Sequence, residues 1–508
     1  MKQLIHLPEP KLLFRYDQSL EDPRDGLTLF GPLDSGQIYG IRSGVVGTQP
    51  GIARFKRWVQ SIQGPIISAT TDAESLYRPF FPGFQTVFGV RWSPTPQIEI
   101  SIDPDELIKR IRIGNSHQRV FQTVSLFADA IIEAKRKEDV QVDVWFVIVT
   151  EDVEKYCRPL STVESSIRVE VDSIVSESEA KQFVKEPPLY PEMVEAAQPF
   201  YYEPDFHNQL KARLLLNPAP IQIIRETTIA PQDFLKANGY PVRKVDKPSV
   251  IAWNICTTAF YKASGRPWKL AHVRPGVCYL GLVFKRDERS IDSTNACCAA
   301  QMFLDSGDGV VFKGAIGPWY SPTNKEFHLS SEASKEVVKT AVETYKEKSP
   351  NKRPPKELFI HGRIRFSDEE WDGFKSAVDR TTKLIGVQIN NRGDLKVYSN
   401  QEYPMLRGMA HIQNPRQAYL WTIGFVPRLQ TFLGKEVPNP LFINVCRGRA
   451  PIEQVLKDIL ALTKLNYNTC QYGDGSPVTL RFADAVGEIL TAGPVQPNSS
   501  PLPFKFYI

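Results

Sequence analysis

The sequence predicts an α/β fold class, with two domains that follow one another along the chain. Strand-like residues 37–47 are followed at once by helical periodicity over residues 50–62, which is one strand–helix unit. The run from Val142 to Val149 is rich in β-branched residues and has no charge after Asp143, as in a central strand covered on both faces. The second half opens with three strand-like runs and a helix, so alternating elements continue there.

The first half contains a longer helix and two segments of unusual composition. Residues 118–137 have helical periodicity and end in Lys135-Arg136-Lys137. Just upstream, residues 109–119 are the densest basic segment of the chain, either a solvated helix end or a contact to a nucleic-acid backbone. Residues 162–204 are rich in Ser and Glu and then in Pro, which predicts an exposed excursion and not a domain boundary.

The domain boundary is expected near residues 268–276, where prolines and Gly276 interrupt the chain. We therefore expect a first domain, with an N-terminal extension, over residues 1–270 and a second over 271–508. In the second, strands are expected over residues 277–285, 296–304 and 310–316, a helix over 330–348, a strand over 357–364 and a helix from Ser367. Meander, helix, strand and helix is the order of an RNase H-like fold. Ser367 and Glu370 have the spacing of a capping box.

The composition indicates that any basic site is local. Residues are 42% hydrophobic and 23% charged, and 62 Lys and Arg against 57 Asp and Glu leave a formal charge of only +5. The seven cysteines form no CxxC pair, which argues against a disulfide framework and a structural zinc site. The N-terminus lacks the apolar run of a signal peptide, and no apolar stretch approaches about 20 residues. We expect a cytoplasmic protein without a membrane segment.

The most informative stretch is a short helix that follows Pro204. Phe206, Leu210 and Leu214 recur every four residues and predict its buried stripe, with Asp205 as the N-cap. His207 and Lys211 lie one turn apart on a face about 100° from that stripe, so both can reach one anion.

Two more polar residues follow this helix. Gln222 stands at the start of a short buried strand over residues 221–224, and Lys262 precedes a helix end at Gly265. Ordinary alternatives exist, because a His/Lys pair also occurs on solvated helix faces and Gln222 could mark a strand edge.

In combination, His207, Lys211, Gln222 and Lys262 resemble in order and spacing the pocket of Argonaute MID domains that holds the end of the guide strand. Residues 22–32 are similar to the start of the MID domain in prokaryotic Argonautes, and the second half resembles a PIWI domain. We expect no N-terminal or PAZ domain before them. The chain therefore resembles a short prokaryotic Argonaute, and its overall likeness is greatest to those that work with a TIR-APAZ partner. The resemblance implies a Rossmann-like MID domain followed by an RNase H-like PIWI domain.

The resemblance also implies a ligand for the pocket. His207, Lys211, Gln222 and Lys262 would hold the 5′-phosphate of a guide RNA. In related proteins the terminal carboxylate, here that of Ile508, helps to hold Mg²⁺ against this phosphate, and a carboxylate is a suitable hard donor. Alternatively, residues 503–508 are only a packed last segment.

The resemblance further implies that the PIWI-like second half has a nuclease fold without nuclease activity. PIWI domains that cut have one aspartate in the first strand and another near the end of the fourth, and the apparent positions here are Val283 and Gly362. Residues 462–468, near the last acid position, offer amides but no acid. Without these acids, two Mg²⁺ ions would lack the negative charge that holds them. Asp287 and Asp368 lie nearby, and we expect them to be structural.

The implied function is that of a sensor and not of an enzyme. The chain would bind guide RNA, recognise complementary single-stranded DNA of plasmids or phages, and activate a TIR-APAZ partner to hydrolyse NAD⁺. The two proteins would form a heterodimer, which could assemble further on activation. Two alternatives remain: an active guide-directed nuclease, and a structural scaffold whose pocket no longer binds nucleic acid.

Overall fold

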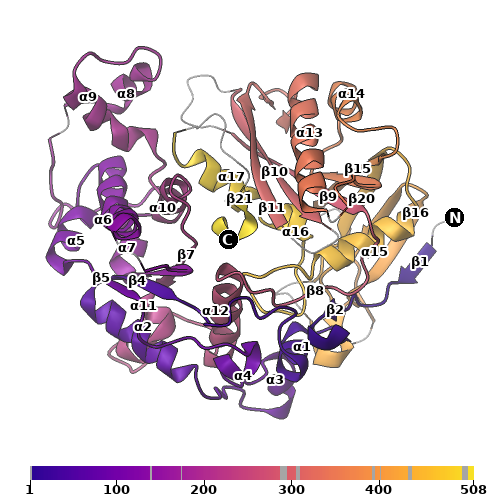
Figure 1. Ribbon diagram of the computed structural model, residues 1–508, viewed down its shortest axis with the longest axis horizontal. Helices are drawn as coiled ribbons and strands as arrows, with labels where there is room; N and C mark the ends of the chain where they lie inside the picture. The colour runs from indigo at the N-terminus through magenta and orange to yellow at the C-terminus, as the bar shows by residue number, and fades with distance from the viewer. Residues whose placement is uncertain are drawn as a thin grey trace.

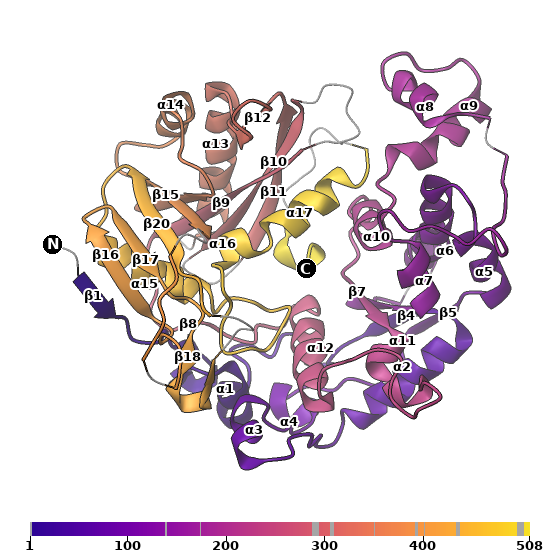
Figure 2. The same cartoon turned by 180° about the vertical axis from the view of Figure 1, so that it is seen from behind.

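The protein has two main β-sheets, one in each half of the fold, and they differ in strand direction (Figure 1; Figure 2 shows the opposite side). The computed structural model describes residues 3–137, 140–172, 174–286, 294–304, 309–349, 351–391, 395–400, 402–432, 437–494 and 502–508. Within these ranges, the helices lack the combination of length and hydrophobicity that a membrane crossing requires.

The first sheet has four parallel strands in the order β5–β4–β6–β7. They are β4 (Ser43–Gly47), β5 (Ile98–Ser101), β6 (Val144–Val149) and β7 (Ile221–Arg225). Alternate residues of β6 pack on opposite faces: Phe146 against the side of α2 (Gln49–Ser61) and α12 (Pro248–Lys262), and Trp145 against the side of α6 (Ser116–Lys137) and α10 (Phe206–Leu214). The prediction of a central strand covered on both faces is confirmed.

The predicted strand over residues 37–47 is wrong in its first half. Only Ser43–Gly47 is a strand, because Gly40 adopts a positive φ of 89° in a turn. A Cβ at Gly40 would lie 2.0 Å from the Arg91 carbonyl oxygen. The helix that follows is confirmed as α2, and the Thr48 hydroxyl caps it by accepting from the Gly51 N–H.

The second sheet is mixed and has the strand order β1–β16–β17–β20–β15–β14–β9–β10–β11–β21. Helices α13 (Ser331–Lys348) and α14 (Asp368–Ser376) cover one face, and α15 (Ile452–Leu462), α16 (Val478–Arg481) and α17 (Ala483–Thr491) lie on the other (Figure 1). The capping box of Ser367 and Glu370 is present at the start of α14. The strands are β1 (Gln3–His6), β9 (Val277–Arg286), β10 (Ala296–Leu304), β11 (Gly309–Gly317), β14 (Glu357–Gly362), β15 (Lys383–Asn391), β16 (Met409–Asn414), β17 (Gln417–Leu420), β20 (Leu441–Arg447) and β21 (Leu502–Pro503). The predicted order of strands and helices is confirmed.

Both ends of the chain belong to this second sheet. Strand β1 pairs with β16 at one edge, and β21 pairs with β11 at the other. The chain enters and leaves the first domain through a small sheet of β2 (Leu12–Leu13), β3 (Ser19–Leu20) and β8 (Lys269–Leu270). The first domain is therefore held between two passages of the chain through the second.

Shorter elements complete the structure. They are α1 (Pro23–Phe30), α3 (Asp72–Tyr77), α4 (Phe84–Phe88), α5 (Pro104–Ile111), α7 (Glu151–Tyr156), α8 (Glu177–Phe183), α9 (Pro191–Ala197), α11 (Glu226–Ile229), β12 (Tyr320–Ser321), β13 (Glu326–Phe327), β18 (Phe425–Val426), β19 (Thr431–Phe432), and the 3₁₀ turns η1 (Arg15–Asp17), η2 (Gln198–Tyr201), η3 (Pro231–Asp233), η4 (Pro427–Leu429) and η5 (Phe504–Phe506).

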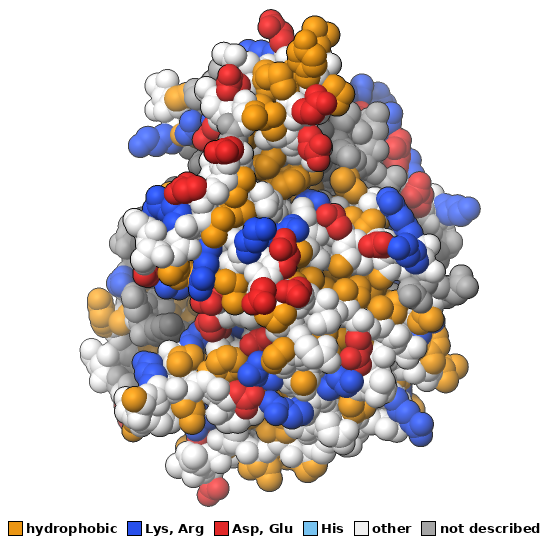
Figure 3. Space-filling model, turned by 90° about the vertical axis from the view of Figure 1, so that its left-hand side faces the viewer, with side chains coloured by type: hydrophobic (Ala, Val, Ile, Leu, Met, Phe, Trp, Pro, Cys, Tyr) orange, Lys and Arg blue, Asp and Glu red, His pale blue; other side chains and the backbone are white. Residues whose placement is uncertain are grey.

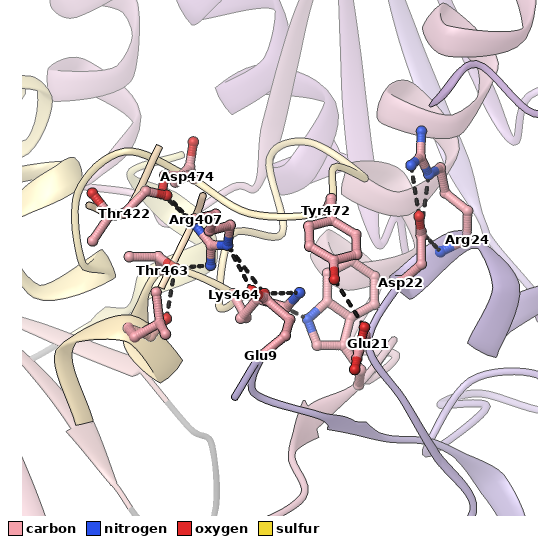
Figure 4. Close-up of polar contacts among 12 residues, drawn as sticks. Glu9, Glu21, Asp22, Arg24, Arg407, Thr422, Thr463, Lys464, Tyr472 and Asp474 are labelled. Carbon is pink, nitrogen blue, oxygen red and sulfur yellow. Dashed lines mark hydrogen bonds and ion pairs between the residues drawn. The ribbon is translucent and has the colours of Figure 1, made fainter. Parts of the chain in front are cut away.

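A buried ionic network fixes the N-terminal segment to the second domain. Glu9 lies between Arg407 and Lys464, at 2.9 Å and 2.7 Å (Figure 4). The two cationic side chains are 1% and 0% exposed. Burial raises the pKa of Glu9, but the charges of Arg407 and Lys464 outweigh it, so the net pKa lies below the usual value. Burial lowers the pKa of Lys464 to about 8 although Glu9 opposes this shift. The carboxylate of Glu9 thus compensates two buried cations.

Replacing Glu9 by Gln should leave both cations buried without this charge. We expect Glu9→Gln to lower the free energy of unfolding by about 3–5 kcal/mol, the cost of breaking a buried ion pair. Urea unfolding against the exposed control Glu347→Gln measures this. A loss of less than about 1 kcal/mol, typical of a surface pair, would contradict the buried assignment.

Candidate anion site at the domain junction

Helix α10 forms as the sequence predicts. The Asp205 carboxylate caps it by accepting from the Asn208 N–H at 2.8 Å. Phe206, Leu210 and Leu214 are buried, and the ring of Phe206 packs edge-on against Phe127 of α6, with centroids 5.3 Å apart. The buried stripe is confirmed, and it fixes the orientation of the polar face of the helix.

Lys211 lies on that polar face and points towards the end of the chain. Its side chain is buried, with the residue 6% exposed, and its Nζ donates to the Tyr507 carbonyl oxygen at 3.1 Å. Tyr507 belongs to the segment that follows β21 of the second domain, and Figure 1 places the C-terminus between α10 and β21. Lys211 therefore joins the first domain to the C-terminal segment.

Lys262 and Gln222 come together beside it. Lys262, 1% exposed at the end of α12, donates from Nζ to the Ile221 carbonyl oxygen and to Gln222 Oε1, both at 2.7 Å. The oxygen of the Gln222 amide is thus directed towards the lysine, which leaves its NH₂ group able to donate elsewhere. Helix α12 and strand β7 are far apart in the sequence, so the tertiary fold creates this pair.

His207 completes the group at its solvent-accessible side. Its Nδ1 lies 3.1 Å from Asn208 Oδ1. The charge of Lys211, followed by burial and the charge of Lys262, lowers the pKa of His207, so the imidazole is neutral near pH 7. Lys211, Lys262 and His207 are thus close enough to influence one another electrostatically, and all four predicted residues surround one place.

The electrostatics of this place favour an anion. Burial lowers the pKa of Lys211 to about 7, and burial together with the charge of Lys211 lowers the pKa of Lys262 well below its usual value. Within the described part of the chain, neither lysine forms an ion pair with a carboxylate. A bound dianion would restore the protonated state of both groups and compensate their charge.

Lys505 also lies at this site, although the sequence alone did not indicate it. Lys505 donates from Nζ to the Lys262 carbonyl oxygen at 3.2 Å and to Ser264 Oγ at 2.7 Å, and thereby ties the C-terminal segment to the end of α12. The only signal in the sequence is a lysine between Phe504 and Phe506 in an apolar terminus. Its position beside Lys262 depends on the long-range pairing of β21 with β11.

The donor set at this junction fits a Mg²⁺ ion that is held mainly by a phosphate. Ile508 is buried and directly follows Tyr507, whose carbonyl oxygen accepts from Lys211, so its terminal carboxylate is in the same region. Mg²⁺ prefers one or two carboxylates together with phosphate oxygens and water. Among the described residues, no cluster of three or more His, Cys, Asp and Glu side chains could hold a metal by itself. The Ile508 carboxylate and a ligand phosphate would both be needed.

The two positions considered for lost acids lie on adjacent parallel strands of the second sheet, Val283 on β9 and Gly362 on β14. A Cβ at Gly362 would meet Phe366 at 2.9 Å, on the side of α13 and α14. Valine and glycine carry no carboxylate. The lack of nuclease activity stays a prediction.

The residues on either side of Gly362 have partners of their own. In the parallel register, Gly281 of β9 pairs with His361 of β14. The His361 ring is buried and its Nδ1 lies 2.9 Å from Thr479 Oγ1, while Arg363 donates to Asp484 at 2.8 Å. A histidine and a cation thus flank Gly362, the apparent second acid position.

Other candidate residues have structural partners or lie outside the site. Arg119, in the basic segment, is 0% exposed and its guanidinium donates to four backbone carbonyl oxygens, so it is not free to contact nucleic acid. Asp368 pairs with Arg447 at 2.7 Å. Lys464, in the segment expected near the last acid position, pairs with Glu9 in the buried network. Asp287 lies outside the described residues.

The fold and the site thus define an α/β protein of two domains with a cluster of buried lysines at their junction. Several solved structures of Argonaute proteins have a similar fold. Clostridium butyricum Argonaute bound to a guide DNA and a 19-mer target DNA matches with a TM-score of 0.61 and 14% identity over 100% of this chain. Aquifex aeolicus Argonaute matches with a TM-score of 0.56, also at 14% identity over 100%. No protein-family model matches the sequence, and no curated protein does.

These similarities establish the fold and its extent. The chain has the α/β fold of Argonaute MID and PIWI domains, including the RNase H-like second domain. It spans little more than half of the structures that it matches, covering 55% and 57% of those two chains.

The buried lysines should cost stability in the free protein. The unfolded chain keeps the proton on Lys211 up to about pH 10.5, and the folded chain only up to about 7. Between these values the unfolded state binds more protons, so the free energy of unfolding should rise with pH. We expect Lys211→Met to raise the free energy of unfolding at pH 7 by about 1–4 kcal/mol and to flatten this slope.

Urea unfolding at pH 7, 8 and 9 measures this effect, with the exposed Lys335→Met as the control. Lower stability of Lys211→Met at every pH would show that the hydrogen bond to Tyr507 outweighs the cost of burying the ammonium group.

Proposed function

We propose that this chain is a catalytically inactive guide-binding protein that works in a defence complex. It would hold the 5′-phosphate of a guide RNA at the domain junction and pair that guide with single-stranded DNA of a plasmid or phage. The paired state would activate a TIR-APAZ partner, which would carry out NAD⁺ hydrolysis in the cytoplasm. The chemistry of the complex would then belong to the partner and not to this chain.

The observation that carries the proposal is the burial of Lys211 and Lys262 beside each other without a carboxylate partner in the described chain. Buried charges are stable only when they are paired, so a pocket of this kind selects a ligand with at least one full negative charge. A terminal phosphate supplies up to two charges and several acceptor oxygens. The lysines would compensate its charge, and the Gln222 NH₂ group and the His207 ring would offer directional contacts.

The choice of a guided sensor rests on the fold and on the resemblance of the pocket. In guided systems the protein reads backbone shape, and Watson–Crick pairing reads sequence, so this chain needs no residues that recognise particular bases. The matched Clostridium butyricum protein carries a guide DNA and a target DNA. An RNA guide and the TIR-APAZ partner are inferred from the similarity to short prokaryotic Argonautes.

The absence of cutting is supported by the residues at the expected acid positions. These positions are Val283 and Gly362, and neither residue can contribute a carboxylate. The neighbouring acids of α14 are used in other ways, since Glu370 closes the capping box and Asp368 pairs with Arg447.

A phosphorylated guide should therefore bind better than an unphosphorylated one. For the protein co-expressed with its partner, we expect Lys211→Ala to cost about 1.5–3 kcal/mol, roughly 10- to 150-fold in Kd, for 5′-phosphorylated RNA. Binding of 5′-hydroxyl RNA should change little. Fluorescence anisotropy with both RNAs measures this, and chelation of Mg²⁺ should weaken only the phosphorylated guide.

Lys335→Ala is the matched control, because Lys335 is exposed on α13. Equal affinities for the two RNAs, unchanged in Lys211→Ala, would contradict the proposal and favour the structural scaffold.

The complex should consume NAD⁺ without cutting DNA. With a phosphorylated guide, complementary labelled DNA and Mg²⁺, we expect the labelled strand to stay intact while NAD⁺ declines, because the metal-binding acids are lacking. Gel electrophoresis and an NAD⁺ assay on one sample measure both. Mg²⁺-dependent cleavage that disappears in Asp368→Asn would instead establish an active nuclease.

A further inference from the structure

A small lobe projects from the first domain at the end furthest from β5 and β4 (Figures 1 and 2). It contains α8, α9 and η2, between residues 174 and 201. Val175, Ala180, Ala197 and Phe200 form its own buried core, and the ring of Phe200 packs on His117 of α6 with centroids 5.5 Å apart. The lobe is therefore a folded unit attached to α6, and its outer surface has a fixed shape.

That outer surface is unusually apolar. Leu189 is 93% exposed, and Val184, Tyr190 and Ile174 are 69%, 67% and 65% exposed. The lobe also has an open groove of about 470 Å³. Its lining residues are Pro188, Leu189, Pro191, Val194, Glu195 and Gln198. In Figure 3 hydrophobic side chains gather over the lobe at the top of the molecule, with acidic side chains around them. Contiguous exposed apolar surface of this kind marks an interaction site more often than an inert surface.

The segment that forms the groove has a net negative charge, whereas the whole chain has a net positive charge. Residues 174–198 contain five glutamates and two lysines, a balance of −3, whereas the whole chain has +5. Glu177 pairs with Lys181, and Glu179 closes the capping box of α8. The other three glutamates are exposed, and within the described chain they form no ion pair: Glu186, Glu192 and Glu195.

An apolar groove with unpaired glutamates beside it favours one kind of binding partner over others. Phosphates of a nucleic acid and anionic lipid headgroups would meet unpaired glutamates of the same sign. A purely apolar segment would fill the groove but leave these glutamates partly desolvated and unpaired. An amphipathic protein segment with Leu-like residues on one face and Lys or Arg on the other satisfies both features.

We propose that the lobe is a docking surface for a second protein, which inserts apolar side chains along Leu189 and Val194 and places basic side chains beside Glu192 and Glu195. The surface lies apart from the lysine pocket, so this proposal does not depend on guide binding. It makes the lobe the part of the first domain that contacts a partner.

The test uses the full-length protein and a labelled synthetic peptide of 18 residues with leucines on one helical face and lysines on the other. A matched peptide carries glutamates in place of the lysines. By fluorescence anisotropy, we expect the lysine peptide to bind at least about tenfold more tightly than the glutamate peptide. Glu192→Gln/Glu195→Gln should remove most of this preference, and Glu192→Lys/Glu195→Lys should reverse it.

Glu343→Lys/Glu347→Lys, a pair of exposed glutamates on α13, is the control and should leave the preference unchanged. Leu189→Ser should weaken binding of the lysine peptide without changing the circular dichroism spectrum. Equal binding of the lysine peptide to the wild-type protein and to the lobe variants would overturn the proposal. So would light scattering that shows a dimer lost in Leu189→Ser, because the occupant would then be a second copy of this chain.

Discussion

The burial of two ammonium groups next to each other is the constraint on which the candidate site depends. Lys211 and Lys262 come from two helices of the first domain, and among the residues that the structure describes their hydrogen-bond partners are neutral: the Tyr507 carbonyl oxygen, the Ile221 carbonyl oxygen and the Gln222 amide. Neutral acceptors orient an ammonium group but do not compensate its charge. The fold thus holds these lysines ready for an anion and accepts a cost in stability for doing so.

The arrangement of the chain explains how such a pocket is held in place. The first domain is inserted between β3 and β8, while the N-terminal strand and the C-terminal strand both join the second sheet. Glu9 fastens the N-terminal segment to Arg407 and Lys464, and Lys505 fastens the C-terminal segment to the end of α12. Residues of both domains consequently meet at the lysine cluster, where Lys211 contacts Tyr507 and Lys505 contacts the end of α12.

Elements with a strong local signal were predicted well, and positions that depend on long-range register were not. Helix α10 was predicted together with its cap, because a stripe at helical spacing and an N-terminal aspartate are local features. The strand expected over residues 37–42 is absent because a turn at Gly40 approaches the backbone of Arg91. The position of Lys505 beside Lys262 was not predicted, because it depends on the pairing of β21 with β11. Arg119 seemed available in a basic segment, but carbonyl groups from four residues surround it.

The sequence by itself determined the α/β class and the order of the elements, which follow from periodicity, capping and composition acting over a few residues. The resemblance to Argonaute MID domains singled out His207, Lys211, Gln222 and Lys262, and their role as a phosphate site stays a prediction. Only the tertiary structure decided that Lys211 and Lys262 are buried with no carboxylate partner in the described part of the chain, and that Lys505 and the Tyr507 carbonyl join them. It also decided that an acidic, apolar lobe projects from the first domain. Burial and charge compensation depend on which distant segments are packed together, and no local pattern in the chain encodes that.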